Sequence, residues 1–230
     1  MIPLRDTNPT AGTPIVNRLL ILVNVAAWVY VLTIIRSPGE LDAFYTKYAF
    51  DWSVFTSRLS QGELAIGTFI PLFTHMFLHG GWLHILGNML YLWIFGDNVE
   101  DRLGHGRYLV FYLACGVIAA AGQGLIQPSP MVGASGAIAG VLGAYIVLFP
   151  AAQISTLVFL GIFISVVRLP ALLVIGFFVV VQFLDGLAQV RVSGSESAEQ
   201  VAYFAHIVGF FAGVVLIIFV RPSRGLAARR

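Results

Sequence analysis

Positions 131–144 read M-V-G-A-S-G-A-I-A-G-V-L-G-A, an uncharged run of small and aliphatic residues. This pattern predicts an apolar helix with Ser135 in its first turn. A serine at a helix start is ordinarily an N-cap, because its hydroxyl accepts a backbone N–H. Inside a membrane, however, a polar group without a partner is costly. Ser135 is therefore a functional candidate if other segments bring partners to it.

The composition around this run is that of a polytopic membrane protein. Of 230 residues, 58% are hydrophobic and 10% are charged, and the mean hydropathy is +0.88. Soluble domains carry about 25% charged residues, so we expect a lipid bilayer as the environment. The net charge of +2 is small and spread along the chain, which argues against a nucleic-acid partner. Cys115 is the single cysteine, so no intramolecular disulfide is possible.

Six apolar segments predict an all-α bundle of six membrane spans. The first is long enough to cross a hydrocarbon core of about 30 Å. The spans are expected at 17–35, 84–99, 107–126, 135–149, 170–187 and 201–220. A disordered polar arm at 1–16, a membrane domain at 17–220 and a short basic tail at 221–230 complete the expected organisation.

Three connections carry expectations of their own. Residues 36–82 are rich in aromatics, which collect at membrane interfaces, and predict short interfacial helices. Residues 154–167 are apolar but short for a span, and are expected to form an interfacial lead-in to the fifth span. Residues 188–200, rich in Ser and Gly, are expected to form a mobile lid.

Basic residues predict the orientation, since they accumulate on the inner side of a membrane. With the N-terminus inside, nine of the 13 Lys and Arg residues fall on the inner side. We therefore expect N-in/C-in topology, with the loop before Ser135 on the outer side. The compact form and short tails suit a bacterial inner membrane.

The fourth predicted span is short for a membrane crossing. Its 15 residues give about 22 Å at 1.5 Å per residue, roughly 8 Å less than the hydrocarbon core. A helix of this length that reaches the inner face begins below the outer surface. Ser135 is thus expected in a recessed cavity that water enters from outside.

One face of the fourth span and one face of the sixth are lined by small residues. On the fourth span they are Ser135, Ala139 and Gly143 with the adjacent stripe Gly136, Gly140 and Ala144, and on the sixth they are Gly209 and Gly213, following His206. Small residues let membrane helices approach closely. If the two faces meet, the imidazole of His206 comes within hydrogen-bond reach of the Ser135 hydroxyl.

A hydroxyl beside an imidazole can act as nucleophile and general base. The tetrahedral intermediate then needs donors aimed at its oxyanion. The candidates are His84 and Asn88, four residues apart on one helix face, and the backbone N–H groups at the start of the fourth span. His79 belongs to the entry of the second span. Asp185, near the outer end of the fifth span, is the one weak carboxylate candidate to orient His206, so the sequence predicts a dyad rather than a triad.

Four stretches resemble the rhomboid intramembrane serine proteases, over about residues 15–222. They are H-G-G-W-L-H-I-L-G-N (79–88), V-E-D-R-L-G-H-G-R-Y (99–108), G-A-S-G-A (133–137) and A-H-I-V-G-F-F-A-G (205–213). The resemblance implies a six-helix bundle that cleaves other membrane proteins within or beside their transmembrane helices.

The resemblance also implies roles for individual residues. Ser135 corresponds to the family's nucleophile and His206 to its base. His84 and Asn88 correspond to the pair that helps form the oxyanion hole, and His79 to a histidine that supports the cavity. No metal and no cofactor is implied.

The chain departs from the family pattern at two places. Many members carry an aromatic residue four positions after the serine, packed against the catalytic histidine, whereas this chain has Ala139. We expect another aromatic, such as Tyr145 or Tyr203, to orient His206 instead. Some members also have a Trp-Arg pair in the first loop, and this chain has none.

The predicted function is therefore that of an intramembrane serine endopeptidase acting on single-span or polytopic membrane proteins. A substrate helix is expected to enter between the second and fifth spans and to unwind locally. One alternative is a non-catalytic membrane scaffold, in which Ser135 and His206 only hold two spans together. A small transporter is disfavoured, because no acidic residue lies in the middle of a span.

Overall fold

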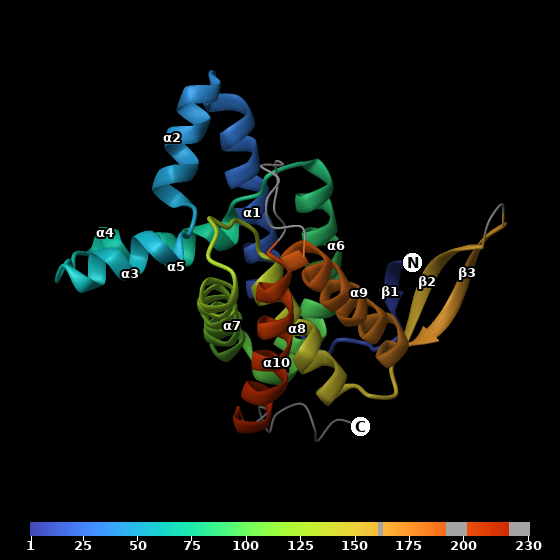
Figure 1. Ribbon diagram of the computed structural model, residues 1–230. Helices are drawn as coiled ribbons and strands as arrows, with labels where there is room; N and C mark the ends of the chain where they lie inside the picture. The colour runs from blue at the N-terminus through green and yellow to red at the C-terminus, as the bar shows by residue number, and fades with distance from the viewer. Residues whose placement is uncertain (161–162, 192–201, 221–230) are drawn as a thin grey trace.

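The computed structural model describes residues 1–160, 163–191 and 202–220. These residues form a helical bundle with a small sheet at its side (Figure 1). The helices are α1 (Ile15–Ile34), α2 (Pro38–Tyr48), α3 (Trp52–Ser60), α4 (Ile66–Phe69), α5 (Pro71–Thr74), the 3-10 turn η1 (His75–Phe77), α6 (Trp82–Leu103), α7 (His105–Ile126), α8 (Ser135–Leu148), α9 (Ala171–Arg191) and α10 (Tyr203–Phe219). The strands are β1 (Ile2–Asp6), β2 (Gln153–Leu160) and β3 (Phe163–Pro170).

Each of the six predicted spans corresponds to one helix, namely α1, α6, α7, α8, α9 and α10. In the described part of the chain, three helical segments are long and apolar enough to cross a membrane: Ile15–Ile34, His105–Ile126 and Ala171–Ala188. The apolar helices α8 and α10 are shorter, at 14 and 17 residues. α6 has 22 residues but carries polar groups at both ends. The predicted short helices between the first two spans are α2 to α5 and η1.

The prediction of an all-α fold is wrong in one region. β1, β2 and β3 form an antiparallel sheet in that order, which extends from the bundle beside α9 (Figure 1). It includes part of the arm expected to be disordered and the segment expected to be an interfacial lead-in. β2 and β3 are rich in β-branched residues, which favour strands. Periodicity alone cannot separate a short apolar strand from a short apolar helix.

The N-terminal strand is also held by side chains of the bundle. Asp6 Oδ2 accepts hydrogen bonds from the Tyr145 hydroxyl at 2.7 Å and from the Asn98 amide at 2.8 Å. Partial burial raises the pKa of Asp6 above its usual value. Tyr145 also accepts a hydrogen bond from the Asn8 amide at 2.9 Å. These contacts tie residues 6–8 to α6 and α8.

α8 is the most enclosed helix of the bundle. Every residue from 136 to 145 is buried, and the helix packs against α6, α7 and α10. The contact with α10 is made backbone to backbone. A Cβ atom on Gly213 would lie 1.9 Å from the Gly140 carbonyl oxygen, and one on Gly209 would lie 2.1 Å from that of Gly136. The small faces predicted from the sequence therefore meet.

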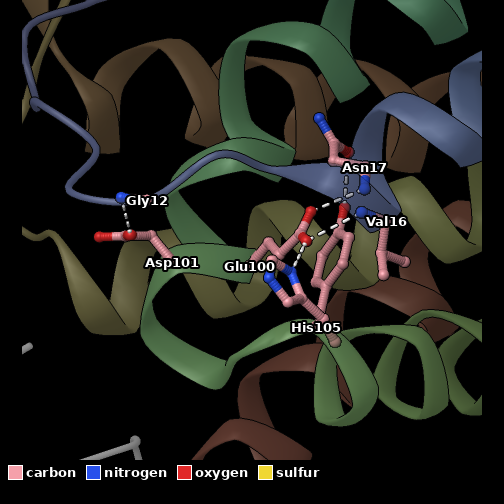
Figure 2. A network of polar contacts seen from close by, with 7 residues as sticks. Gly12, Val16, Asn17, Glu100, Asp101 and His105 are labelled. Atoms are coloured by element: carbon pink, nitrogen blue, oxygen red, sulfur yellow. Dashed lines mark hydrogen bonds and ion pairs between the residues drawn. The ribbon is translucent and has the colours of Figure 1, made fainter. Parts of the chain in front are cut away.

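A buried carboxylate joins the end of α6 to the start of α1 (Figure 2). Glu100 is 1% exposed. Its two carboxylate oxygens accept the backbone N–H groups of Val16 at 2.9 Å and Asn17 at 2.6 Å. His105 Nδ1 lies 2.5 Å from Glu100 Oε1. Glu100 thus satisfies two N–H groups that the first turn of a helix leaves free, at the end where the helix dipole favours negative charge.

We expect Glu100→Ala to destabilise the protein by about 2–5 kcal/mol, because one buried and one partly buried N–H group lose a charged acceptor. The measurement is the thermal unfolding midpoint of the detergent-solubilised chain. Asp101→Ala is the matched control, since Asp101 accepts one exposed backbone bond from Gly12 at 2.9 Å. Equal midpoints for the two variants would contradict this role for Glu100.

Candidate active site

Ser135 begins α8, but its hydroxyl does not cap the helix. The N-cap residue is Ala134, and no side chain caps this end. The Ser135 Oγ atom instead lies 2.6 Å from Nε2 of His206 on α10, at hydrogen-bond distance. His206 is 8% exposed and Ser135 is half-buried. Two residues 71 positions apart in sequence thus meet where α8 and α10 are in backbone contact.

The second ring nitrogen of His206 also has a partner. Nδ1 is in contact with Oε1 of Gln182 on α9. Two aromatic rings flank the imidazole: Phe178 of α9, with a centroid distance of 6.1 Å, and Tyr203 of α10, at 6.5 Å. His206 is therefore oriented by both α9 and its own helix.

Sequence reasoning missed Gln182 and Phe178. The available signal was one amide inside the apolar segment V-V-V-Q-F-L, since polar groups within spans are expensive and are often functional. Of the two tyrosines expected to orient His206, Tyr203 contacts it. Tyr145 was the wrong choice, because its hydroxyl donates to Asp6 on the N-terminal strand.

The structure places His84 next to the segment that leads into Ser135. Gly133 has φ +129°, a conformation that L side chains rarely adopt. A Cβ atom there would lie 2.6 Å from His84 Nε2 and 3.4 Å from Ser135 Oγ. The Gly133 N–H donates to the His75 carbonyl at 2.8 Å, which fixes this turn. Glycine is thus required at 133 by its backbone and by the nearby imidazole.

Asn88 lies one helical turn after His84 on α6, as the sequence spacing predicts. It is 8% exposed. Its buried side-chain nitrogen finds no hydrogen-bond partner among the described residues. A buried donor of this kind costs free energy unless an acceptor binds it, so the amide is available to an acceptor that enters the site.

His79 contacts His84 rather than the serine. The two rings pack edge to face with centroids 5.0 Å apart. The His79 carbonyl accepts the Tyr45 hydroxyl at 2.7 Å, which ties α2 to this loop. Burial, with a smaller contribution from His84, lowers the pKa of His79 to about 3. His79 is thus a neutral ring that supports His84.

Residues 1–160, 163–191 and 202–220 contain no cluster of three or more His, Cys, Asp or Glu side chains that could hold a metal ion. The candidate site instead contains a hydroxyl, imidazoles and amides, which come from four helices.

The fold and the site define an integral membrane protein with a hydroxyl–imidazole pair inside a bundle of apolar helices. The Rhomboid domain family matches residues 67–223, more than half of the chain. The chain therefore belongs to the rhomboid family, which confirms the resemblance drawn from the sequence.

Two curated relatives show how far the similarity extends. The chain is 42% identical over 88 residues to the rhomboid protease GluP of Bacillus subtilis (strain 168), which covers 38% of this chain and 16% of GluP. It is 36% identical over 70 residues to the rhomboid protease GlpG of Yersinia pestis (strain Pestoides F), which covers 30% of this chain and 25% of GlpG. The matched segment is thus a quarter or less of either relative.

Proposed function

We propose that this protein is an intramembrane serine endopeptidase. The observation that carries the proposal is the 2.6 Å contact between Ser135 Oγ and His206 Nε2. In the proposed reaction, Oγ attacks the scissile carbonyl while Nε2 takes the hydroxyl proton. The imidazolium gives that proton to the leaving amine as the C–N bond breaks. A water molecule, deprotonated by the same nitrogen, then releases the acyl group from Ser135.

The groups that stabilise the oxyanion of the tetrahedral intermediate are the Asn88 amide, His84 and the backbone N–H groups at the start of α8. Support comes from the unpartnered Asn88 nitrogen and from the position of His84 beside Gly133. Such donors are effective because they are already in place when charge develops. The positive end of the α8 dipole adds to the stabilisation.

We expect Asn88→Ala to lower kcat by about 10²–10³-fold with little change in KM, because the amide binds the transition state rather than the ground state. The measurement is steady-state cleavage of a transmembrane substrate. Asn24→Ala is the control: Asn24 is a buried asparagine on α1, whose amide donates to Leu20 of its own helix. A kcat for Asn88→Ala within twofold of the control would remove Asn88 from the oxyanion site.

The proposal includes six spans in an N-in/C-in arrangement within a bacterial inner membrane. It is supported by the six helices at the predicted positions and by the distribution of Lys and Arg. Ser135 then lies in a recessed, water-filled cavity that opens to the outer side. The expected lid, residues 188–200, belongs to α9 as far as Arg191, and its remainder lies outside the described residues.

The substrates are membrane proteins whose helices unwind easily, such as those with glycine near the cut and a small residue before it. The test uses the full chain in detergent and a single-span substrate with a Gly-containing segment. We expect cleavage by the unchanged chain and none by Ser135→Ala. Equal cleavage by both chains would reject Ser135 as the nucleophile, and no cleavage by the unchanged chain would favour the non-catalytic scaffold.

A further inference from the structure

The face of α9 that meets His206 carries two side chains one turn apart. Gln182 contacts Nδ1 of the imidazole, and Phe178 lies against its ring with a tilt of 35°. Phe178 also packs on Tyr91 of α6, with ring centroids 5.6 Å apart. Both residues belong to a helix that supplies neither Ser135 nor His206. The geometry of the imidazole therefore depends on α9.

We propose that Gln182 is the positioning residue for His206, a third member of the site that acts through the imidazole. This inference rests on the proposed function. Gln182 selects the tautomer of His206. An amide oxygen can only accept a hydrogen bond, so the contact with Gln182 Oε1 keeps the imidazole proton on Nδ1. Nε2 then keeps its lone pair and faces the Ser135 hydroxyl as an acceptor. The opposite tautomer places a proton on Nε2 and leaves no base for Ser135.

An amide suits this position better than a carboxylate does. His206 is buried among apolar helices, where an added negative charge is expensive to desolvate. Gln182 gives the imidazole an acceptor at no cost in net charge. A partner of this kind fixes both the tautomer and the ring orientation of a histidine. This accounts for Ala139, because α9 provides the contact that an aromatic at that position would supply.

Because Gln182 belongs to α9, the orientation of His206 depends on where α9 lies. α9 is held to the bundle by Val174 and Ile175, which are buried near its start. Its second half meets α10 at the buried Gly186, where a Cβ atom would lie 3.2 Å from that of Tyr203. A displacement of the second half of this helix separates Gln182 from His206. The base is therefore fully oriented only while α9 is packed against α10.

The experiment compares Gln182→Met and Gln182→Glu in the full chain in detergent. Met keeps the volume but removes the acceptor, whereas Glu keeps an acceptor oxygen. We expect Gln182→Met to lower both kcat and the rate of fluorophosphonate labelling by about 10–100-fold, with KM within about twofold, since a buried hydrogen bond of this kind is lost. Gln182→Glu should recover most of the rate. The acid limb of its pH–rate profile should shift to higher pH than that of the unchanged chain, because a carboxylate stabilises the imidazolium.

Val180→Ala is the matched control, because Val180 lies on the opposite, exposed side of α9, and it should keep the unchanged rate. Thermal midpoints of all variants separate loss of fold from loss of orientation. The proposal is overturned if Gln182→Met reacts at the unchanged rate. It is equally overturned if Gln182→Glu is as slow as Gln182→Met with the same pH profile, since the side chain would then act by packing alone. An unmodified chain that neither cleaves nor labels would instead reject the proposed function.

Discussion

Ser135→Ala and His206→Ala are each expected to lower kcat for a transmembrane substrate by at least about 10⁴-fold, since serine proteases lose rates of this order when the nucleophile or base is removed. The reason is that the hydroxyl and the imidazole, 2.6 Å apart, act as one unit. The double variant should be no slower than the slower single variant. Cleavage is measured by gel or mass spectrometry with the purified chain and substrate in the same micelles.

Ser155→Ala serves as the control for the serine change, because Ser155 lies on strand β2, away from α8 and α10. His105→Ala controls for loss of an imidazole, although it also removes a contact to Glu100. Both should retain activity. If the rate losses of Ser135→Ala and His206→Ala add in the double variant, the two residues act independently and the dyad is wrong.

Gly213→Val is expected to lower both the stability of the protein and its rate of substrate cleavage. Its Cβ atom would lie 1.9 Å from the Gly140 carbonyl oxygen and 2.6 Å from the Gly140 Cα atom. Backbone atoms cannot yield as a flexible side chain does, so α10 must move away from α8. Overpacking of this kind costs about 1–3 kcal/mol or more. A displacement of about 1 Å at a catalytic contact costs roughly 10²-fold in rate.

The measurements on Gly213→Val are the thermal unfolding midpoint in detergent and the rate of substrate cleavage. Gly176→Val is the control, because a Cβ atom on Gly176 of α9 meets nothing within 4 Å. We expect a lower midpoint and at least about 10²-fold slower cleavage only for Gly213→Val. A Gly213→Val chain as stable and as active as the control would show that close contact between α8 and α10 does not hold the site.

The helical part of this fold could be predicted because its signals are local and strong. Long apolar segments give the helices, and the small residues at Gly136, Gly140, Gly209 and Gly213 identify the faces that meet. Once those faces are identified in the sequence, they place Ser135 opposite His206.

The pairing of β1 with β2 and the partners of His206 depend on contacts between distant segments, which the local sequence does not specify. β1 pairs with β2 about 150 residues later, with Ile2 opposite Leu157. Gln182 reaches His206 only because α9 returns along α10, and Tyr145 is directed to the N-terminal strand. For Gln182 and Tyr145, only the assembled fold reveals which partner a single polar side chain finds.

We propose above that Ser135 is a nucleophile activated by His206. The most direct measurement is to treat the full chain in detergent with a fluorophosphonate and to locate the adduct by peptide mass spectrometry. We expect one phosphonyl group, on Ser135, and no adduct in the His206→Ala variant. An adduct on another residue, or labelling of Ser135 that persists without His206, would contradict it.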